Sequence, residues 1–139
     1  FPRVKLGAGT GRLVAGELAG QTGPAQVHSP MVVMDLVFDQ AGMSELVLPV
    51  GWNVVLVALR GPVELGGTPV PLGHYAVMES GSSDPVVLSG EPGARVLVLC
   101  GEPIDEPVVS YGPFVMNSWD EIRQAMVDYQ AGRMGRLTR

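Results

Sequence analysis

The chain contains two histidines, His28 and His74, and imidazole nitrogens are common ligands of catalytic metal ions. A catalytic metal site needs about three protein donors that converge on one open-sided ion. Two histidines would therefore need a carboxylate from elsewhere in the chain. Two interpretations stay open: a metal site built on His28 and His74, or two loop or strand-end histidines that hold no metal. We favour the second.

Acidic side chains occur at two places where they could do chemistry. Asp35 interrupts an apolar run and could be a buried acid in a ligand pocket, but a strand bend or a hydrogen-bonded acid is the interpretation we favour. Glu102, Asp105 and Glu106 could act as paired carboxylates in acid–base catalysis. Because they flank prolines, we expect a solvated, charged edge that discourages strand addition.

Other groups give little support for catalysis. Cys100 is the single cysteine and ends an apolar run, so we expect a buried small side chain without a disulfide or metal. The chain has no Gly-x-Ser-x-Gly motif of a serine nucleophile. Trp52 and Tyr75 could line a pocket for a small aromatic ligand, although packing in the core or rim is the favoured use. We therefore assign no catalytic and no cofactor-binding residue.

Short strands must position these residues. Apolar segments recur between residues 12 and 100, separated by turns rich in Gly, Ser, Asp and Pro. About eight or nine such strands with no helix among them predict an all-β fold, an antiparallel β-sandwich or jelly-roll barrel. Residues 1–11 are expected to be a linker or edge segment that leads into this barrel.

The segment 101–117 is expected to be an extended strap. Pro103 and Pro107 remove backbone donors, which excludes an interior strand. Gly112-Pro113 then breaks the segment before three apolar residues.

One C-terminal helix is predicted over residues 118–132. Ser118 and Glu121 have the spacing of a capping box, in which the glutamate side chain reaches back to the Ser118 amide. Gly132 is expected to end the helix in a left-handed conformation. One apolar stripe of the helix could dock on the barrel. Residues 133–139 would form a tail, and the whole chain one domain.

The sequence Gly-Glu-Pro-Ile-Asp-Glu-Pro-Val-Val-Ser-Tyr-Gly-Pro-Phe-Val-Met-Asn at 101–117, followed by Ser-Trp-Asp-Glu-Ile, closely resembles the C-terminal signature of the pirin family, in the cupin superfamily. Gly16-Glu17 and Gly23-Pro24 resemble the opening of the second pirin domain, so the resemblance covers most of the chain. Members of this family have two cupin domains and hold iron in the first. The signature residues, which we expect at or near an interface, are Glu102, Pro103, Glu106, Pro107, Tyr111, Gly112, Pro113, Phe114, Met116 and Asn117.

The resemblance also locates the positions where cupins hold metal. The ligand positions of the two cupin motifs would fall on Leu48, Val50, Val54 and Ala76, or within one residue of them, and none of these side chains can bind a metal. His74 lies two residues too early. We therefore expect no metal and no other cofactor in this chain.

The resemblance implies a metal-free C-terminal cupin domain that packs against and supports an iron-binding N-terminal cupin domain. The intact protein would then resemble an iron-dependent quercetin 2,3-dioxygenase or a transcriptional co-regulator. The implied partners are the N-terminal cupin domain, another copy of the chain, and a transcription-related protein. Two alternatives stay open: a stand-alone metal-binding cupin dioxygenase that uses His28 and His74, or a regulatory interaction module with an exposed apolar patch around Phe114 and Met116.

The charge and the apolar segments of the chain argue against nucleic acid and membrane as partners. The formal net charge is −5, and the last residues of the chain concentrate arginines, so we expect no basic face that could follow a nucleic-acid backbone. We see neither a signal peptide nor an apolar run long enough to cross a bilayer. The expected location is the cytoplasm.

Overall fold

The computed structural model of the protein describes residues 1–78 and 84–135. The chain divides into two compact units, Phe1–Pro103 and Ile104–Arg139, each of which is described by itself below. Within the described ranges, no helix is both long enough and apolar enough to span a membrane.

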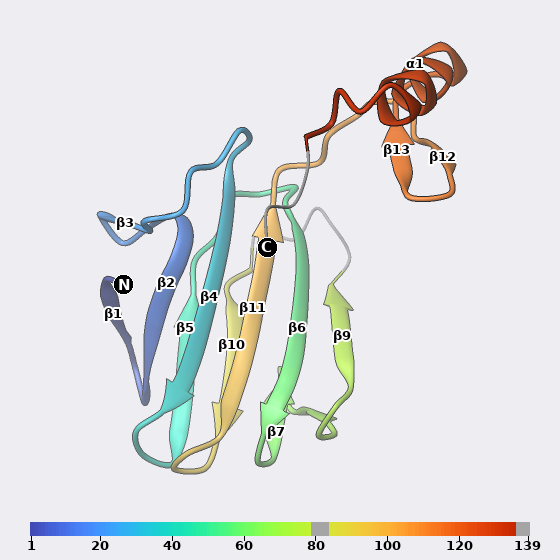
Figure 1. Ribbon diagram of the computed structural model, residues 1–139. Coiled ribbons are helices and arrows are strands. Elements are labelled where there is room, and N and C mark those ends of the chain that lie inside the picture. Colours follow the sequence, from blue (N-terminus) through green and yellow to red (C-terminus); the bar gives the residue numbers. More distant parts are fainter. Residues whose placement is uncertain (79–83, 136–139) are drawn as a thin grey trace. The chain divides into compact units, whose positions relative to one another are not determined.

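The N-terminal unit is a sandwich of two antiparallel sheets (Figure 1). The larger sheet has the strand order β1-β2-β4-β11-β6-β9, with the short β3 paired to β2, and the smaller sheet has the order β5-β10-β7-β8. The strands are β1 (Arg3–Leu6), β2 (Gly9–Leu18), β3 (Gln21–Thr22), β4 (Met31–Phe38), β5 (Gly42–Leu46), β6 (Asn53–Arg60), β7 (Val63–Leu65), β8 (Thr68–Val70), β9 (Tyr75–Met78), β10 (Val86–Gly90) and β11 (Arg95–Gly101).

The topology is that of a jelly roll. β4 pairs with β11, β5 with β10, β6 with β9, and β7 with β8. These are the pairs of one long hairpin whose tip is the β7–β8 turn, and folding that hairpin over places alternate pairs in opposite sheets. The prediction of an all-β antiparallel sandwich is therefore confirmed.

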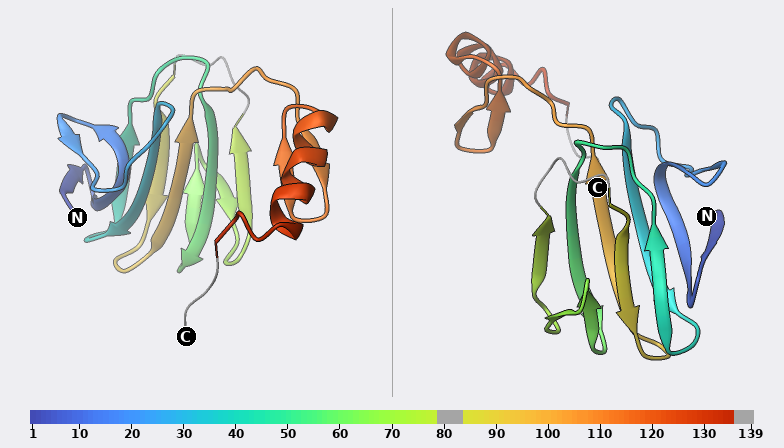
Figure 2. Two further views of the ribbon diagram at one scale, coloured as in Figure 1. Left: turned by 45° about the horizontal axis from the view of Figure 1, so that its top comes forward. Right: turned by 180° about the vertical axis from the view of Figure 1, so that it is seen from behind.

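The core lies between the two sheets. The view from behind shows the smaller sheet in front of the larger one (Figure 2, right). Side chains alternate between the two faces of a strand, so the even-numbered residues of β4 all point inward. Met34 and Leu36 are fully enclosed there, opposite Leu46 and Leu88 of the smaller sheet. Burying each such side chain contributes about 1.5–3 kcal/mol, which makes this layer the main source of stability in the unit.

Residues 1–11 are part of the larger sheet. β1 is its edge strand, and Leu6 pairs with Gly9 across a tight turn in which Gly7 has a φ of +56°. A left-handed φ of this kind suits glycine, which has no Cβ to clash. Residues 3–6 thus form a paired strand at the edge of the larger sheet.

The C-terminal unit consists of a two-stranded hairpin and one helix. The hairpin is formed by β12 (Val109–Tyr111) and β13 (Phe114–Met116), and the helix is α1 (Trp119–Gln130). Gly112, with a φ of +56°, and Pro113 make the turn. The predicted strap is thus extended only in part: its second half folds back on itself because a glycine in the first turn position favours a tight hairpin.

The helix begins and ends with side-chain and backbone caps. Ser118 Oγ accepts a hydrogen bond from the Glu121 amide at 3.3 Å, as the capping box predicts. The returning bond differs from the prediction, because Glu121 Oε2 accepts from the amide of Asn117, at 3.0 Å, instead of the amide of Ser118. Gly132 has a φ of +70°, and the amides of Gly132 and Arg133 donate to helix carbonyls in a Schellman motif.

The apolar stripe of α1 is buried within the C-terminal unit. Ile122 and Ala125 are almost fully enclosed, and α1 packs on the β12–β13 hairpin. The rings of Phe114 and Tyr129 meet edge to face at 6.3 Å. The apolar stripe of α1 is thus covered by the β12–β13 hairpin. Docking of the helix on the barrel stays a prediction.

Candidate functional site

The two histidines lie in different parts of the N-terminal unit. His28 is exposed in the loop between β3 and β4, beside a cleft of about 430 Å³ that Glu17, Met31 and Trp52 also line. His74 is exposed in the turn before β9, where its Nδ1 lies 3.3 Å from the carbonyl oxygen of Leu72. The groove beside His74 shares no lining residue with the His28 cleft. The structure therefore does not bring the two histidines together.

The cupin ligand positions carry apolar side chains. Val54 belongs to the buried core, and Leu48 packs against that core from its edge. Ala76 is half-buried on β9 and pairs with Leu56. Val50 is 63% exposed and lies in the turn that precedes β6.

Residues 1–78 and 84–135 contain no set of side chains that could bind a metal ion. No group of three or more His, Cys, Asp or Glu side chains in those ranges could hold one. An iron site needs several nitrogen or oxygen donors on one ion. The two histidines lie in separate clefts and the cupin ligand positions carry apolar side chains, so these residues do not fit an iron site. We therefore derive no chemical step through a metal from the described residues.

Asp35 lies on the outer face of the larger sheet, beneath two arginines. Arg95 donates from Nε to Oδ1 and from Nη2 to Oδ2, both at 2.6 Å, and Arg12 donates to Oδ2 at 3.0 Å. The Asp35 side chain is 9% exposed, whereas both arginines are about half exposed. The hydrogen bonds from Arg95 lower the pKa of Asp35 below its ordinary value, helped by the charges of Arg95 and Arg12 and opposed by burial. Asp35 is thus a paired structural acid.

The two arginine partners of Asp35 were not predicted from the sequence. In the sheet, Asp35 on β4 lies opposite Arg12 on β2, and Arg95 lies on the other neighbouring strand, β11. Strand alternation predicts that these side chains share one face once the register is known. The register itself depends on which strands pair, and a single sequence does not reveal that.

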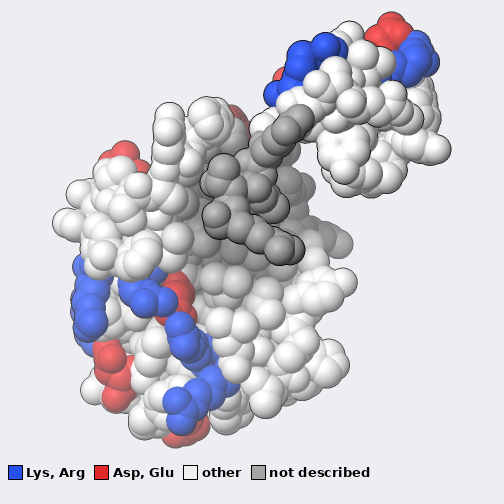
Figure 3. Space-filling view, viewed as in Figure 1, with Lys and Arg blue, Asp and Glu red and all other residues white. Residues whose placement is uncertain are grey.

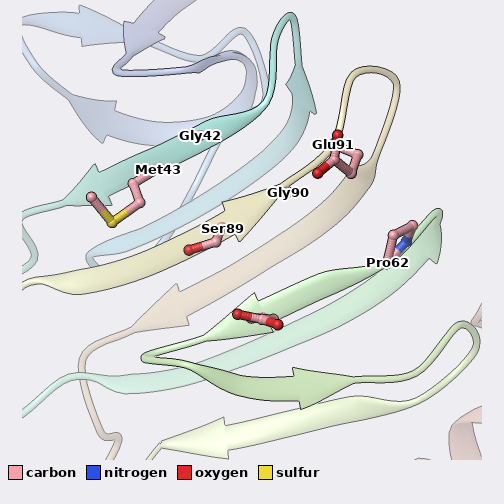
Figure 4. Close-up of a pocket in the computed structure, with 7 residues that line it drawn as sticks. Gly42, Met43, Pro62, Ser89, Gly90 and Glu91 are labelled. Carbon is pink, nitrogen blue, oxygen red and sulfur yellow. The ribbon is translucent and has the colours of Figure 1, made fainter.

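A pocket of about 290 Å³ lies on the outer side of the smaller sheet (Figure 4). Met43 comes from β5, Ser89 from β10, and Glu91 from the turn after β10. Glu64 and Glu91 supply two carboxylate groups, fewer than the three protein ligands that a catalytic metal ion usually has. The pocket offers no nucleophile paired with a base.

Most of the signature residues, from Glu106 to Asn117, belong to the C-terminal unit, whereas Glu102 and Pro103 end the N-terminal unit. Asn117 Nδ2 donates to Glu106 Oε2 at 3.0 Å and to the Pro107 carbonyl at 2.9 Å. These bonds tie the start of the strap to the start of α1. The ring of Tyr111 lies 6.5 Å from that of Trp119. The signature thus specifies a local fold, in which Phe114 and Met116 are half-buried.

The remaining sequence candidates lie in several separate places. Glu102, Asp105 and Glu106 are exposed, as expected of a solvated edge. Cys100 is buried and makes no disulfide, and burial raises the pKa of its thiol to about 11. Trp52 lines the His28 cleft, while Tyr75 is 69% exposed on β9, so the two aromatic residues do not share a pocket.

The fold and these apolar motif positions define a cupin-type jelly roll. The family model of the Pirin C-terminal cupin domain matches residues 33–135. The chain therefore belongs to the pirin family, and the matched part is its C-terminal cupin domain. The resemblance predicted from residues 101–117 is confirmed.

Relatives of the chain are about twice as long as the chain itself. A Pseudomonas aeruginosa protein named "Putative quercetin 2,3-dioxygenase" is 40% identical over 136 residues, which are 96% of this chain and 47% of that protein. Human pirin is 28% identical over 139 residues, 97% of this chain and 48% of pirin. The crystal structure of quercetin 2,3-dioxygenase from Acinetobacter baumannii superposes with a TM-score of 0.87 at 31% identity, covering 99% of this chain and 48% of that one.

Proposed function

We propose that the chain is the metal-free C-terminal cupin domain of a two-domain pirin-like protein, where it packs against and supports an iron-binding N-terminal cupin domain. The observation that carries the proposal is the apolar filling of the cupin ligand positions, with Val54 in the core and Leu48 against it. The chain also spans about half the length of the relatives it matches, which leaves room for a second cupin domain in those proteins.

The whole protein would then be an iron-dependent dioxygenase that acts on flavonols such as quercetin. Several relatives are named putative quercetin 2,3-dioxygenase, and the Acinetobacter baumannii structure is named quercetin 2,3-dioxygenase, which supports this substrate class. Dioxygen chemistry of this kind needs the metal, so the iron and its ligands would belong to the other domain. This chain would contribute stability and a wall against which that domain packs.

Metal analysis tests the first half of the proposal. We expect the purified 139-residue chain, incubated with ferrous iron and then dialysed, to retain far less than one iron per chain. The His74→Ala variant should retain the same amount. Stoichiometric iron that is lost in His74→Ala would overturn the proposal in favour of a metal site on His28 and His74.

The native protein tests the second half. We expect an antibody against this chain to detect, in the cells that produce it, a protein of about twice the mass of the chain. That protein should contain iron and consume quercetin with oxygen, and the 139-residue chain with added iron should not. A native mass equal to that of the chain would reject the two-domain proposal.

A role in protein interaction is a second candidate function. The C-terminal unit exposes Ile104, Val108, Val115 and Trp119, all more than half accessible. Such side chains would suit contact with the preceding domain or with a transcription-related protein. Trp119 fluorescence tests the first option: we expect an emission shift to shorter wavelength in the native protein relative to the chain, and no shift would leave this surface free for another partner.

A further inference from the structure

The two outer faces of the sandwich differ in kind. The outer face of the smaller sheet mixes charged and polar side chains, among them Glu45, Glu64 and Ser89, with the apolar Met43 and Val87. A solvated face of an antiparallel sheet is expected to look like this. The outer face of the larger sheet instead presents rows of valine and leucine.

These apolar rows run across four neighbouring strands. Val33, Leu99, Val55 and Val77 are successive cross-strand partners from β4 through β11 and β6 to β9. The next row continues from Asp35 through Leu97, Val57 and Tyr75. The residues on the inner strands are half-buried and those on β9 are exposed, so the rows are open to contact.

Basic side chains border the rows. All Lys and Arg residues of the N-terminal unit belong to strands of the larger sheet. Arg3 lies directly opposite Arg12, and Arg60 opposite Arg95. Figure 3 shows the charged side chains gathered toward β1, β2 and the lower end of this face, while the part over β6 and β9 is drawn without them. We call this group the basic band: Arg3, Lys5, Arg12, Arg60 and Arg95.

The basic band keeps an excess of positive charge. Within the described residues, its ion pairs use two carboxylates: Asp35 with Arg12 and Arg95, and Asp39 with Lys5. Like charges that lie directly opposite on neighbouring strands destabilise a sheet unless an anion compensates them. The whole chain has a net charge of −5, so the positive charge of the basic band is confined to this face and does not reflect the overall composition.

We propose that this face, the apolar rows with their basic border, is the surface on which the preceding cupin domain docks, and that the docked domain places acidic side chains against the basic band. The inference rests on the proposed function, since it names the surface through which the two domains would pack. Four strands spaced by about 4.8 Å and about seven residues of strand length give roughly 300 Å². That area per partner suits the lower range of interfaces between domains of one chain.

Charge favours this occupant over a second copy of the chain. A two-fold dimer would use the same patch on both partners. Each copy would then offer its own basic band, whose carboxylates Asp35 and Asp39 are already paired. A different domain can supply acidic side chains that a second copy lacks on this face, and such complementarity fixes the orientation of partners.

Hydroxyl-radical footprinting with mass spectrometry tests the proposal. Tyr75, 69% exposed on the proposed face, and Met43, 65% exposed on the smaller sheet, form a matched pair of reporters. We expect oxidation of Tyr75 to fall by about an order of magnitude in the native protein relative to the 139-residue chain, because an interface core excludes water. Oxidation of Met43 should not change. Equal oxidation of Tyr75 in both proteins would overturn the proposal.

Two variants of the native protein add a causal test. Val57, the cross-strand partner of Tyr75, and Val87 are half-buried valines on the outer faces of opposite sheets. Val57→Lys should restore the oxidation of Tyr75, and Val87→Lys should not. If both variants behave alike, the docking surface is wrong. The mass of the native protein separates the two proposals: a two-domain protein with an unprotected Tyr75 rejects this inference alone, whereas a single-domain native protein rejects both.

Discussion

Arg95 holds Asp35 with two hydrogen bonds of 2.6 Å, one to each carboxylate oxygen. The two residues are 60 positions apart in the chain and meet because β11 pairs with β4. Paired donors from one guanidinium to one carboxylate are among the strongest hydrogen bonds in proteins. This pair, with Arg12, connects three neighbouring strands across the centre of the larger sheet.

The first prediction concerns Asp35→Asn. We expect the variant to lose about 1–2 kcal/mol of unfolding free energy at pH 7, a reduced figure because the two arginines are half exposed and recover hydration. The pKa of Asp35 is lowered in the folded state from its ordinary value of 3.8. The pairs therefore stabilise the fold above about pH 4 and lose this effect as pH falls through the folded pKa.

Urea unfolding at several pH values checks this. The difference between the original chain and Asp35→Asn should shrink as the pH is lowered from 7 to 3. Asp39→Asn is the comparison: the pair with Lys5 also lowers the pKa of Asp39, but this acid is about half exposed, so its substitution should cost less stability than Asp35→Asn. A difference that stays constant with pH would show that Asp35 does not act through its charge.

The second prediction concerns Ser44, whose Oγ is completely buried. Among the described residues it finds no hydrogen-bond partner. A buried hydroxyl without a partner is unfavourable, so Ser44→Ala should raise the unfolding free energy by up to about 1 kcal/mol. Chemical denaturation followed by circular dichroism measures this. A loss of stability would mean that the hydroxyl has a partner, such as an ordered water molecule.

The third prediction concerns Asn117, the residue that ties the strap to the helix. Asn117→Ala removes its bonds to Glu106 and to the Pro107 carbonyl. We expect a loss of about 1 kcal/mol, seen as faster amide hydrogen exchange in residues 106–116. Gln124→Ala, which removes an exposed bond of 2.8 Å to Asp128, is the matched amide control and should change exchange less. Equal effects of both substitutions would contradict the role of Asn117.

The fourth prediction concerns the reactivity of Cys100. Burial raises the pKa of its thiol to about 11, so the reactive thiolate is scarce at neutral pH. We expect no labelling by iodoacetamide in the folded chain at pH 8 within the time that labels the urea-unfolded chain completely. Rapid labelling under folding conditions would show that β11 opens locally near its end.

Much of this protein was readable from local patterns. Turn residues between short apolar segments predicted the sandwich, because each strand carries its own alternation and each turn its own glycine or proline. The capping residues Ser118 and Gly132 predicted the two ends of the helix, since caps act within a few residues of each other. The signature segment identified the family, and the lack of donors at the cupin positions was visible in the residue types alone.

The tertiary structure decided what depends on distant residues. It paired Asp35 with Arg95 and Arg12, placed His28 and His74 in separate clefts, and folded the strap into a hairpin against α1. It also placed Val50 in an exposed turn, which motif spacing did not show. Such features follow from strand register and from which sheet each strand joins, and those choices are made by packing over the whole core, where a shift of one residue exchanges the two faces.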